Sequence, residues 1–478
     1  MSGGHRYCPE PRLQELGSNF YDHVQALQFP ERVLRFRNGP WSREVGLEHL
    51  SDERWLDHFG SFESLPGNLK GPHCMRYHGH QFHNYNPELG DGRGFTFAQI
   101  RARDGRLLDL GTKGSGPTPY SRGGDGRLTL KGGVREILAT EMLEALGVNT
   151  SKTFSIIETG EALQRGDEPS PTRSCVLVRL GHSHLRFGSF QRLAHDGVPV
   201  ETQKLVDHAV AHYFPELEDA LAPEERYAQF FEQVSQKTIE LVASWTASGF
   251  VHGVLNTDNM NICGESFDYG PWRFLPTYDP NFTAAYFDHN GLYSFSRQAD
   301  AVGWNLLRLA ESLESLISLD RASDWLRKRY YVDFDLALNR RISKRLGLTA
   351  RADEHVNQKG EGLAALVFRF MRENDVGFER FFFDCYGGIA DETRALRGPH
   401  AAAYGGPSFL ELGRAMQRHE RSPEACRRLK DPYFSGDGPQ TMLIEEVEEI
   451  WSAIEANDDW EPLRRKVADL RSVGVAAG

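Results

Sequence analysis

The sequence predicts a mixed α+β protein of two lobes, a β-rich one followed by a mostly helical one. The densest glycine clusters and several short alternating strand patterns fall within residues 76–200. From about residue 203 onward, apolar residues recur at the helical period instead, most clearly over 226–248, 299–347 and 361–383. Strands gathered in one part and helices in the next favour two packed lobes with a cleft between them.

The same pattern divides the 478 residues into four parts. Residues 1–75 form an N-terminal extension that packs on the lobes and holds helix-like pieces around 20–27 and 47–59. Residues 76–200 form the β-rich lobe, and residues 201–385 form the helical lobe. Residues 386–478 form a C-terminal helical extension, in which 386–410 is rich in Gly, Ala and Pro and predicts a loop or linker. A final helix is expected over 442–454.

Composition excludes several classes of protein. With 55 basic and 67 acidic residues the net charge is −12, which argues against a general nucleic-acid binder. No apolar run approaches the roughly 18 residues needed to span a bilayer, and the N-terminus shows no secretory or organellar signal. The six cysteines lack metal-ligand spacing. We therefore expect a soluble, cytoplasmic protein without a structural zinc or a disulfide framework.

A glycine-rich turn and a strand lysine give the first indication of chemistry. Residues 89–94 read Leu-Gly-Asp-Gly-Arg-Gly and precede an alternating strand that ends at an Asp-Gly hairpin signal, residues 104–105. The return strand, residues 107–113, ends in Lys113. Glycines that admit phosphates to backbone N–H groups, together with a strand lysine, are parts that protein kinases use. Ordinary β-turns are the alternative.

The next segment adds a long loop and a helix. Residues 114–127 are rich in groups compatible with phosphate, and a helix is expected from about Val134 to Leu146, stopped by Gly147. Glu136 lies off the centre of the apolar stripe of that helix. A kinase-like lobe would pair it with Lys113. Alternatively, Glu136 is a solvated acid in the first turn, favoured by the helix dipole.

Two further strands, 154–157 and 174–179, lead to a pair of arginines. Arg179 and Arg186 are seven residues apart, near the expected cleft. Arginine forks bind phosphate in a bidentate manner, although surface salt bridges remain an alternative for either residue.

The segment after the helix at 226–248 resembles a kinase catalytic loop with one part missing. Kinases carry H-x-D-x-x-x-x-N, in which Asp is the base and Asn holds metal. His252 and Asn259 have this spacing, but Val254 occupies the position of the base. Asp258 is the natural substitute, unless Asp258 and Asn259 form a turn or a helix cap.

A carboxylate nine residues after Asn259 completes the candidate metal site. Asp268-Tyr269-Gly270 resembles the D-F-G turn, whose Asp ligates magnesium. An amide oxygen and a carboxylate suit Mg²⁺ or Mn²⁺ and not zinc.

Taken together, these strings resemble the selenoprotein O family, the YdiU-type protein adenylyltransferases. The matching stretches cover roughly residues 75–315 in order, including 89–93, 113–127, 134–136, 183–188, 252–271, 278–280 and 304–306, and the chain past 315 matches poorly. The resemblance implies a protein-kinase-like fold in which the nucleotide binds in an inverted orientation. It also implies transfer of AMP from ATP, and in some members of UMP from UTP with manganese, to Ser, Thr or Tyr hydroxyls of proteins.

The resemblance also implies roles for individual residues. Asp258 would accept the proton, Asn259 and Asp268 would hold Mg²⁺ or Mn²⁺, and Glu136 would support Lys113. The nucleotide would be bound by Gly90, Gly92, Arg93, Lys113, Asp125, Gly126, Arg179, Arg186 and Asp268.

Two other functions remain open on the residues alone. A kinase could transfer the γ-phosphate with Asp258 as its base, and a non-catalytic pseudokinase could bind the nucleotide without transferring it. Many relatives carry a cysteine or selenocysteine near the C-terminus, whereas the last cysteine here is Cys426, so we expect no switch through a C-terminal thiol.

Overall fold

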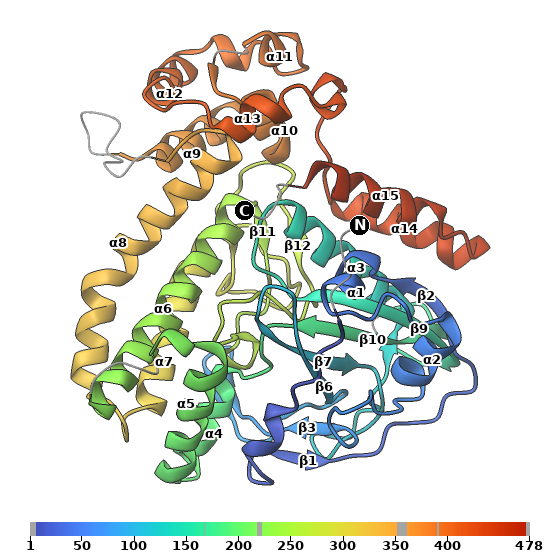
Figure 1. Ribbon diagram of the computed structural model, residues 1–478. Coiled ribbons are helices and arrows are strands. Elements are labelled where there is room, and N and C mark those ends of the chain that lie inside the picture. The colour runs from blue at the N-terminus through green and yellow to red at the C-terminus, as the bar shows by residue number, and fades with distance from the viewer. Residues whose placement is uncertain (1–5, 167, 218–221, 351–360, 390–391, 475–478) are drawn as a thin grey trace.

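The computed structural model describes residues 6–166, 168–217, 222–350, 361–389 and 392–474 (Figure 1). The chain is mixed α+β, as the sequence predicts. An eight-stranded antiparallel sheet has the order β1-β3-β6-β7-β10-β9-β2, with β8 paired to β10. Its strands are β1 (Tyr21–His23), β2 (Val33–Arg37), β3 (His73–Met75), β6 (Thr96–Arg101), β7 (Leu107–Lys113), β8 (Leu128–Thr129), β9 (Lys152–Leu163) and β10 (Thr172–Gly181). Two small ribbons pair β4 (Gly79–Gln81) with β5 (Asn84–Asn86) and β11 (Phe250–Val251) with β12 (Arg273–Phe274).

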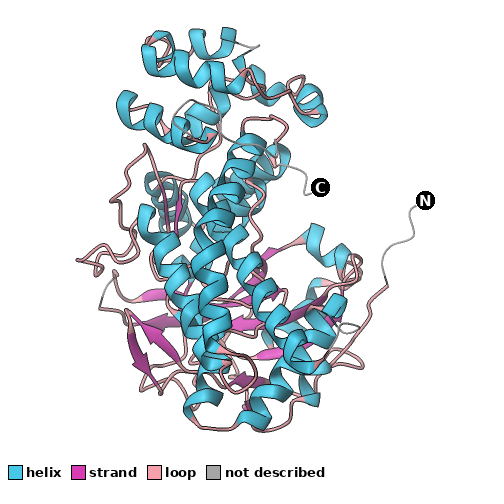
Figure 2. Cartoon of the chain, turned by 90° about the vertical axis from the view of Figure 1, so that its left-hand side faces the viewer, coloured by secondary structure: helices cyan, strands magenta, loops and turns pink. Residues whose placement is uncertain are grey.

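After β10, helices make up most of the described residues. Figure 2 shows the long helices passing in front of the strands, with a cap of shorter helices above them. In chain order, the first helices are α1 (Gly39–Glu44), α2 (Asp52–Gly60), α3 (Leu130–Ala145), α4 (Phe187–His195), α5 (Pro199–Tyr213), α6 (Pro223–Ala247), α7 (Gln298–Ser312) and α8 (Leu319–Arg345). They are followed by α9 (Leu363–Asn374), α10 (Phe378–Asp384), α11 (Glu392–Arg397), α12 (Pro407–Met416), α13 (Pro423–Arg428), α14 (Ile444–Asn457) and α15 (Glu461–Val473). None of them, within the described residues, is both long and apolar enough to cross a bilayer.

The sheet separates two hydrophobic cores because its strands alternate. On β10, Val176 and Val178 pack into a core with α2, where Trp55 stacks on Phe154 at 4.9 Å between ring centroids. Leu177, between them, faces the opposite core, which contains the buried side of α3. Along β7, Lys113 and Leu107 are separated by an even number of positions, so both side chains lie on the face of the sheet that packs against α3. The period of two therefore directs the lysine toward the helix that carries Glu136.

The hairpin that ends in Lys113 forms as expected. Strand β7 spans the predicted residues 107–113, and Gly105 at the turn has a φ of +85° that favours glycine. Helix α3 begins four residues before the expected Val134 because the Thr129 side chain caps it, accepting from Gly132 N at 3.1 Å.

Three expectations about local structure are wrong. Residues 20–27 do not form a helix: β1 lies there and pairs with β3, since strand pairing outweighs the local apolar spacing. The helix expected at 47–59 begins only at Asp52, after the Ser51 cap. The expected loop 386–410 contains α11 and the start of α12, whose Phe409 packs on Phe370 at 5.4 Å.

The C-terminal part continues beyond the expected final helix. Helix α14 is followed by α15, and both return to α3 (Figure 1). Arg471 Nε donates to Glu141 at 2.8 Å and Lys131 Nζ lies 2.7 Å from Glu448, so ion pairs join this part to the helix behind the candidate site. Residues 475–478, on which the expectation about a C-terminal thiol falls, lie outside the described residues.

Candidate functional site

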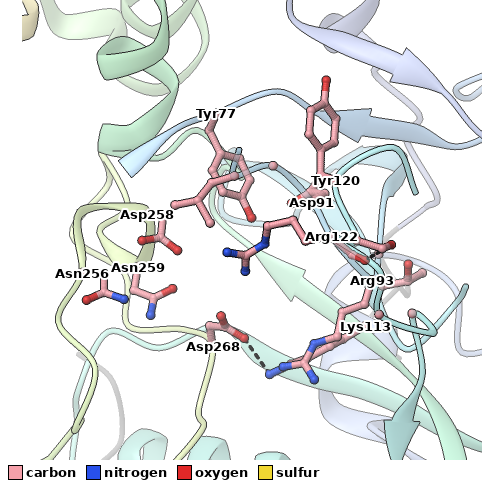
Figure 3. A pocket seen from close by; sticks show the side chains of 18 of the residues that line it. Tyr77, Asp91, Arg93, Lys113, Tyr120, Arg122, Asn256, Asp258, Asn259 and Asp268 are labelled. Carbon is pink, nitrogen blue, oxygen red and sulfur yellow. Dashed lines mark hydrogen bonds and ion pairs between the residues drawn. The ribbon is translucent and has the colours of Figure 1, made fainter. Parts of the chain in front are cut away.

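One cavity of about 700 Å³ lies where the sheet meets the segment that follows α6. Figure 3 shows side chains from both parts pointing into it. All the candidate residues except Glu136 line this cavity: Gly90, Gly92, Arg93, Lys113, Asp125, Gly126, Arg179, Arg186, Asp258, Asn259 and Asp268. Positions that span more than a third of the chain thus converge on one space.

Lys113 lies between two carboxylates. Its Nζ is 2.5 Å from Glu136 Oε1 and 2.6 Å from Asp268 Oδ1. Glu136 is 1% exposed, which rules out the alternative of a solvated first-turn acid. The ion pair between strand lysine and helix glutamate is therefore present, and it holds the ammonium group at the wall of the cavity.

Asp268 is held in an unusual backbone conformation. Its φ is +62°, in the left-handed region, and His252 Nε2 contacts the carbonyl of the preceding Phe267 at 3.0 Å. Burial by itself would raise the pKa of Asp268, but the nearby cations, Lys113 and Arg179 first, outweigh burial and hold this pKa well below its usual range. The side chain is therefore a carboxylate at neutral pH.

Asp258 and Asn259 present oxygens without partners. They belong to a 3-10 turn, Thr257–Asn259, and both are buried. Neither Asp258 Oδ1 nor Asn259 Oδ1 accepts a hydrogen bond from the described residues, whereas Asn259 Nδ2 donates to Val254 O at 3.1 Å. Because neither Oδ1 accepts from a backbone N–H of the residues that the structure describes, these two oxygens do not cap the turn.

The environment of Asp258 changes its acidity. Burial raises the pKa of Asp258 to about 6, although the charge of Arg186 opposes the shift. This carboxyl group can thus accept a proton near neutral pH. The free oxygen of Asn259 and the carboxylate of Asp268 are hard oxygen donors of the kind that Mg²⁺ and Mn²⁺ prefer. The donor set fits the expected metal.

The two arginines are buried and not part of surface salt bridges. Arg186 stacks on Tyr77 at 4.5 Å and on Phe267 at 4.9 Å, and its Nη1 donates to Asp258 O at 2.9 Å. Arg179 also stacks on Phe267, at 5.1 Å, and its Nε and Nη1 are buried and find no partner among the described residues. Buried guanidinium donors without partners next to a cavity are suited to binding an anion.

Glycines give the loops room to approach one another. A Cβ on Gly90 would lie 2.3 Å from the ring of Tyr120, and a Cβ on Gly126, where φ is +68°, would lie 2.1 Å from the backbone of Gly116. Asp125, at the rim, accepts from Arg165 at 2.8 Å, and Arg93 is exposed at the mouth. Replacement of Gly90 or Gly126 by a larger residue would thus force this wall of the cavity to move.

Sequence reasoning missed several residues that line the cavity: Tyr77, Gln81, Asp91, Tyr120, Arg122, Arg165 and Asn256. Arg122 lies in the glycine-rich loop 114–127, so that loop could have indicated it. Asn256 lies in the catalytic-loop-like segment 252–271, two residues before Asp258, so that segment could have indicated it. Tyr77 belongs to no motif, and only its position in the fold brings it to the cavity.

Among the described residues, the cavity combines three features: arginine donors without partners, adjoining carboxylate and amide oxygens, and closely packed glycine loops. Together they define an enzyme of the nucleotide-handling transferase class. Comparison with known proteins identifies the family. The family model described as protein adenylyltransferase SelO matches residues 6–471, and the chain belongs to this family. The expectation of a poor match beyond residue 315 is therefore wrong.

The sequence is similar over nearly its whole length to curated relatives named protein nucleotidyltransferase YdiU. The chain is 40% identical to the Synechocystis sp. protein over 97% of this chain and 98% of the relative. It is 43% identical to the Gloeobacter violaceus protein over 97% and 94% of the two chains, and 42% identical to the Trichodesmium erythraeum protein over 95% and 96%. The protein is thus a nucleotidyltransferase, with a nucleotide as one substrate.

Proposed function

We propose that this enzyme transfers AMP from ATP to Ser, Thr or Tyr hydroxyls of proteins and releases pyrophosphate. UMP transfer from UTP is a second reaction that the family suggests. The observation that carries the proposal is the ion-paired Lys113, in one cavity with the unpaired oxygens of Asp258 and Asn259. The choice of the α-phosphorus rests on the family.

A kinase-like arrangement is part of the proposal. Residues 76–200 and 201–385 would form two lobes around the nucleotide, flanked by extensions at 1–75 and 386–478. The strand lysine, the helix glutamate and the loop that carries Asp268 support this layout. The sheet also takes β1, β2 and β3 from residues before 76.

The cations of the cavity would gather the charge of the triphosphate. Lys113 is oriented by Glu136 and cannot swing away without leaving a buried carboxylate behind. Arg179 and Arg186, fixed by their stacking on Phe267, would donate to phosphate oxygens as the leaving group develops charge. Asn259 and Asp268 would hold the metal, which when bound supplies further neutralisation of phosphate charge.

Asp258 would act on the incoming protein. Its carboxylate would accept the proton of the hydroxyl while the hydroxyl oxygen forms a bond to the α-phosphorus. The bond from that phosphorus to the bridging oxygen breaks, and pyrophosphate leaves with the electron pair. Val254 lines the same cavity at the place of the kinase base, and a valine cannot accept a proton. This favours Asp258 as the base.

The test supplies ATP labelled on either the α- or the γ-phosphorus to the enzyme with a mixture of acceptor proteins, in Mg²⁺ and in Mn²⁺. We expect the α-label in protein and none of the γ-label, and loss of the signal in Asp268→Ala. Transfer of the γ-label would establish a kinase. Metal-dependent ATP binding without transfer of either label would establish a pseudokinase. A parallel reaction with α-labelled UTP measures the nucleotide preference.

A further inference from the structure

A second cluster of metal-ligating side chains lies away from the nucleotide cavity, where the N-terminal segment meets α5. His208 and His212 are four residues apart on α5 and therefore share one face of the helix. Glu15 reaches them from the 3-10 turn Arg12–Glu15. One donor atom from each of the three side chains lies within 4.8 Å of the other two. In Figure 1 the dark-blue N-terminal segment runs beside α5 before it enters β1.

The two oxygens of Glu15 have different partners. Oε1 accepts from Arg12 Nη1 at 2.9 Å, so the arginine orients the carboxylate. Oε2 is 3.0 Å from His212 Nε2 and 4.0 Å from His208 Nδ1. A tetrahedral ion with bonds of about 2.1 Å needs donors about 3.4 Å apart, so small side-chain movements suffice.

The cluster is partly enclosed and remains open at one side. His208 is 7% exposed, so its ring forms the enclosed part of the cluster. The rings of His208 and His212 lie 4.6 Å apart at 69°, in an edge-to-face arrangement. Glu15, with a side chain 48% exposed, leaves a route for an ion to enter.

We propose that Glu15, His208 and His212 form a second metal site, which binds a divalent transition ion of the zinc class. Two imidazoles and one carboxylate are the ligands of such ions, with a fourth position left for water. Mg²⁺, which prefers oxygen ligands, does not compete for this site. The site is thus separate in position and in ligand chemistry from Asn259 and Asp268.

The metal would fasten the N-terminal segment to α5. Lys204 Nζ already donates to Leu16 O at 2.8 Å at this contact. Six residues after Leu16, Asp22 accepts from the hydroxyl of Tyr120 at 2.6 Å, and Tyr120 lines the nucleotide cavity. An ion at the second site therefore stabilises the segment that holds one wall of the first.

The experiment uses untagged full-length protein and Co²⁺ as the probe, with excess Mg²⁺ present to occupy the nucleotide site. We expect one equivalent of Co²⁺ to give visible absorption bands typical of tetrahedral nitrogen and oxygen ligands, and Zn²⁺ to displace it. His212→Ala should weaken binding by about 100-fold or more, since loss of an outer-shell partner alone costs about 10- to 100-fold. Glu15→Gln should also weaken binding.

Controls separate this site from the catalytic one. His49→Ala removes a histidine whose side chain is 81% exposed and should leave the spectrum unchanged. Zn²⁺ should raise the melting temperature of the wild type and of His49→Ala, and not that of His212→Ala. If His212→Ala fails to fold, Glu15→Gln provides the test. Equal Co²⁺ affinity in the wild type and the folded site variants, or loss of the bands only in Asp268→Ala, would overturn the proposal.

Discussion

Replacement of Lys113 separates the stability of the buried ion pair from its role in the reaction. Glu136 has a side chain 2% exposed, and its one side-chain ion-pair partner among the described residues is Lys113. Lys113→Met keeps most of the volume and leaves a buried charge without compensation. Removing one partner of a buried pair costs about 3–5 kcal/mol, so we expect the free energy of unfolding to fall by about that amount.

The double variant Lys113→Met/Glu136→Leu should recover most of this loss. Apolar residues of similar volume often replace a buried ion pair with little change in stability, so we expect the double variant to lie within about 1–2 kcal/mol of the wild type. Asp268 remains compensated, because Arg179 and Arg93 also hold its pKa down. In both variants the labelling rate should nevertheless fall about 10²- to 10³-fold.

Urea unfolding without nucleotide measures the first effect, and incorporation of α-labelled ATP into protein measures the second. The reasoning fails if the double variant is as unstable as the single one. The instability of Lys113→Met would then not come from the uncompensated charge of Glu136. Wild-type labelling in either variant would sink the site assignment.

Three further predictions concern the cavity and the N-terminal segment. Asp258→Asn should lower the labelling rate by about 10²–10⁴ while ATP affinity, measured by titration, stays nearly unchanged; a large loss of affinity would contradict its role as proton acceptor. Gly90→Ala should weaken ATP binding by about tenfold, because its Cβ would lie 2.3 Å from the Tyr120 ring, and Tyr120→Ala in the same chain should restore affinity. Hydrogen bonds from Arg101 lower the pKa of Glu10 to about 2, so its contribution is present above the unfolded value near 4.5 and is lost as the pH falls through 2. Glu10→Gln should therefore cost at most about 1 kcal/mol near pH 7 and clearly less near pH 2, by urea unfolding; an equal cost at both pH values would contradict this.

Local patterns in the sequence predicted the parts of the site that lie within one element or one turn. The alternation of 107–113 and the Asp-Gly turn before it predicted a strand that ends in Lys113. The 3.6-residue spacing of apolar groups predicted α3, although not its Thr129 cap, and the motif spacing from His252 to Asp268 indicated the loop. These features depend on neighbouring residues, and local sterics and hydrogen bonds determine them.

Contacts between distant segments were outside the reach of such patterns. Residues 20–27 have helical spacing and yet contain β1 (Tyr21–His23), because β3, some fifty residues later, offers a partner strand. Tyr77 lines the cavity although it belongs to no motif. The cluster of Glu15 with His208 and His212 joins residues almost two hundred positions apart.

The chemistry of the site was thus determined by the sequence through the types of residue present: an amine, an amide, carboxylates and guanidinium groups at spacings that kinase-like enzymes use. Only the tertiary structure decided their protonation and their partners. Burial raises the pKa of Asp258 to about 6, whereas the cations around Asp268 hold its pKa down. The pKa values of the two carboxyl groups differ because burial and neighbouring charges affect each group through space. Packing determines which residues surround each group.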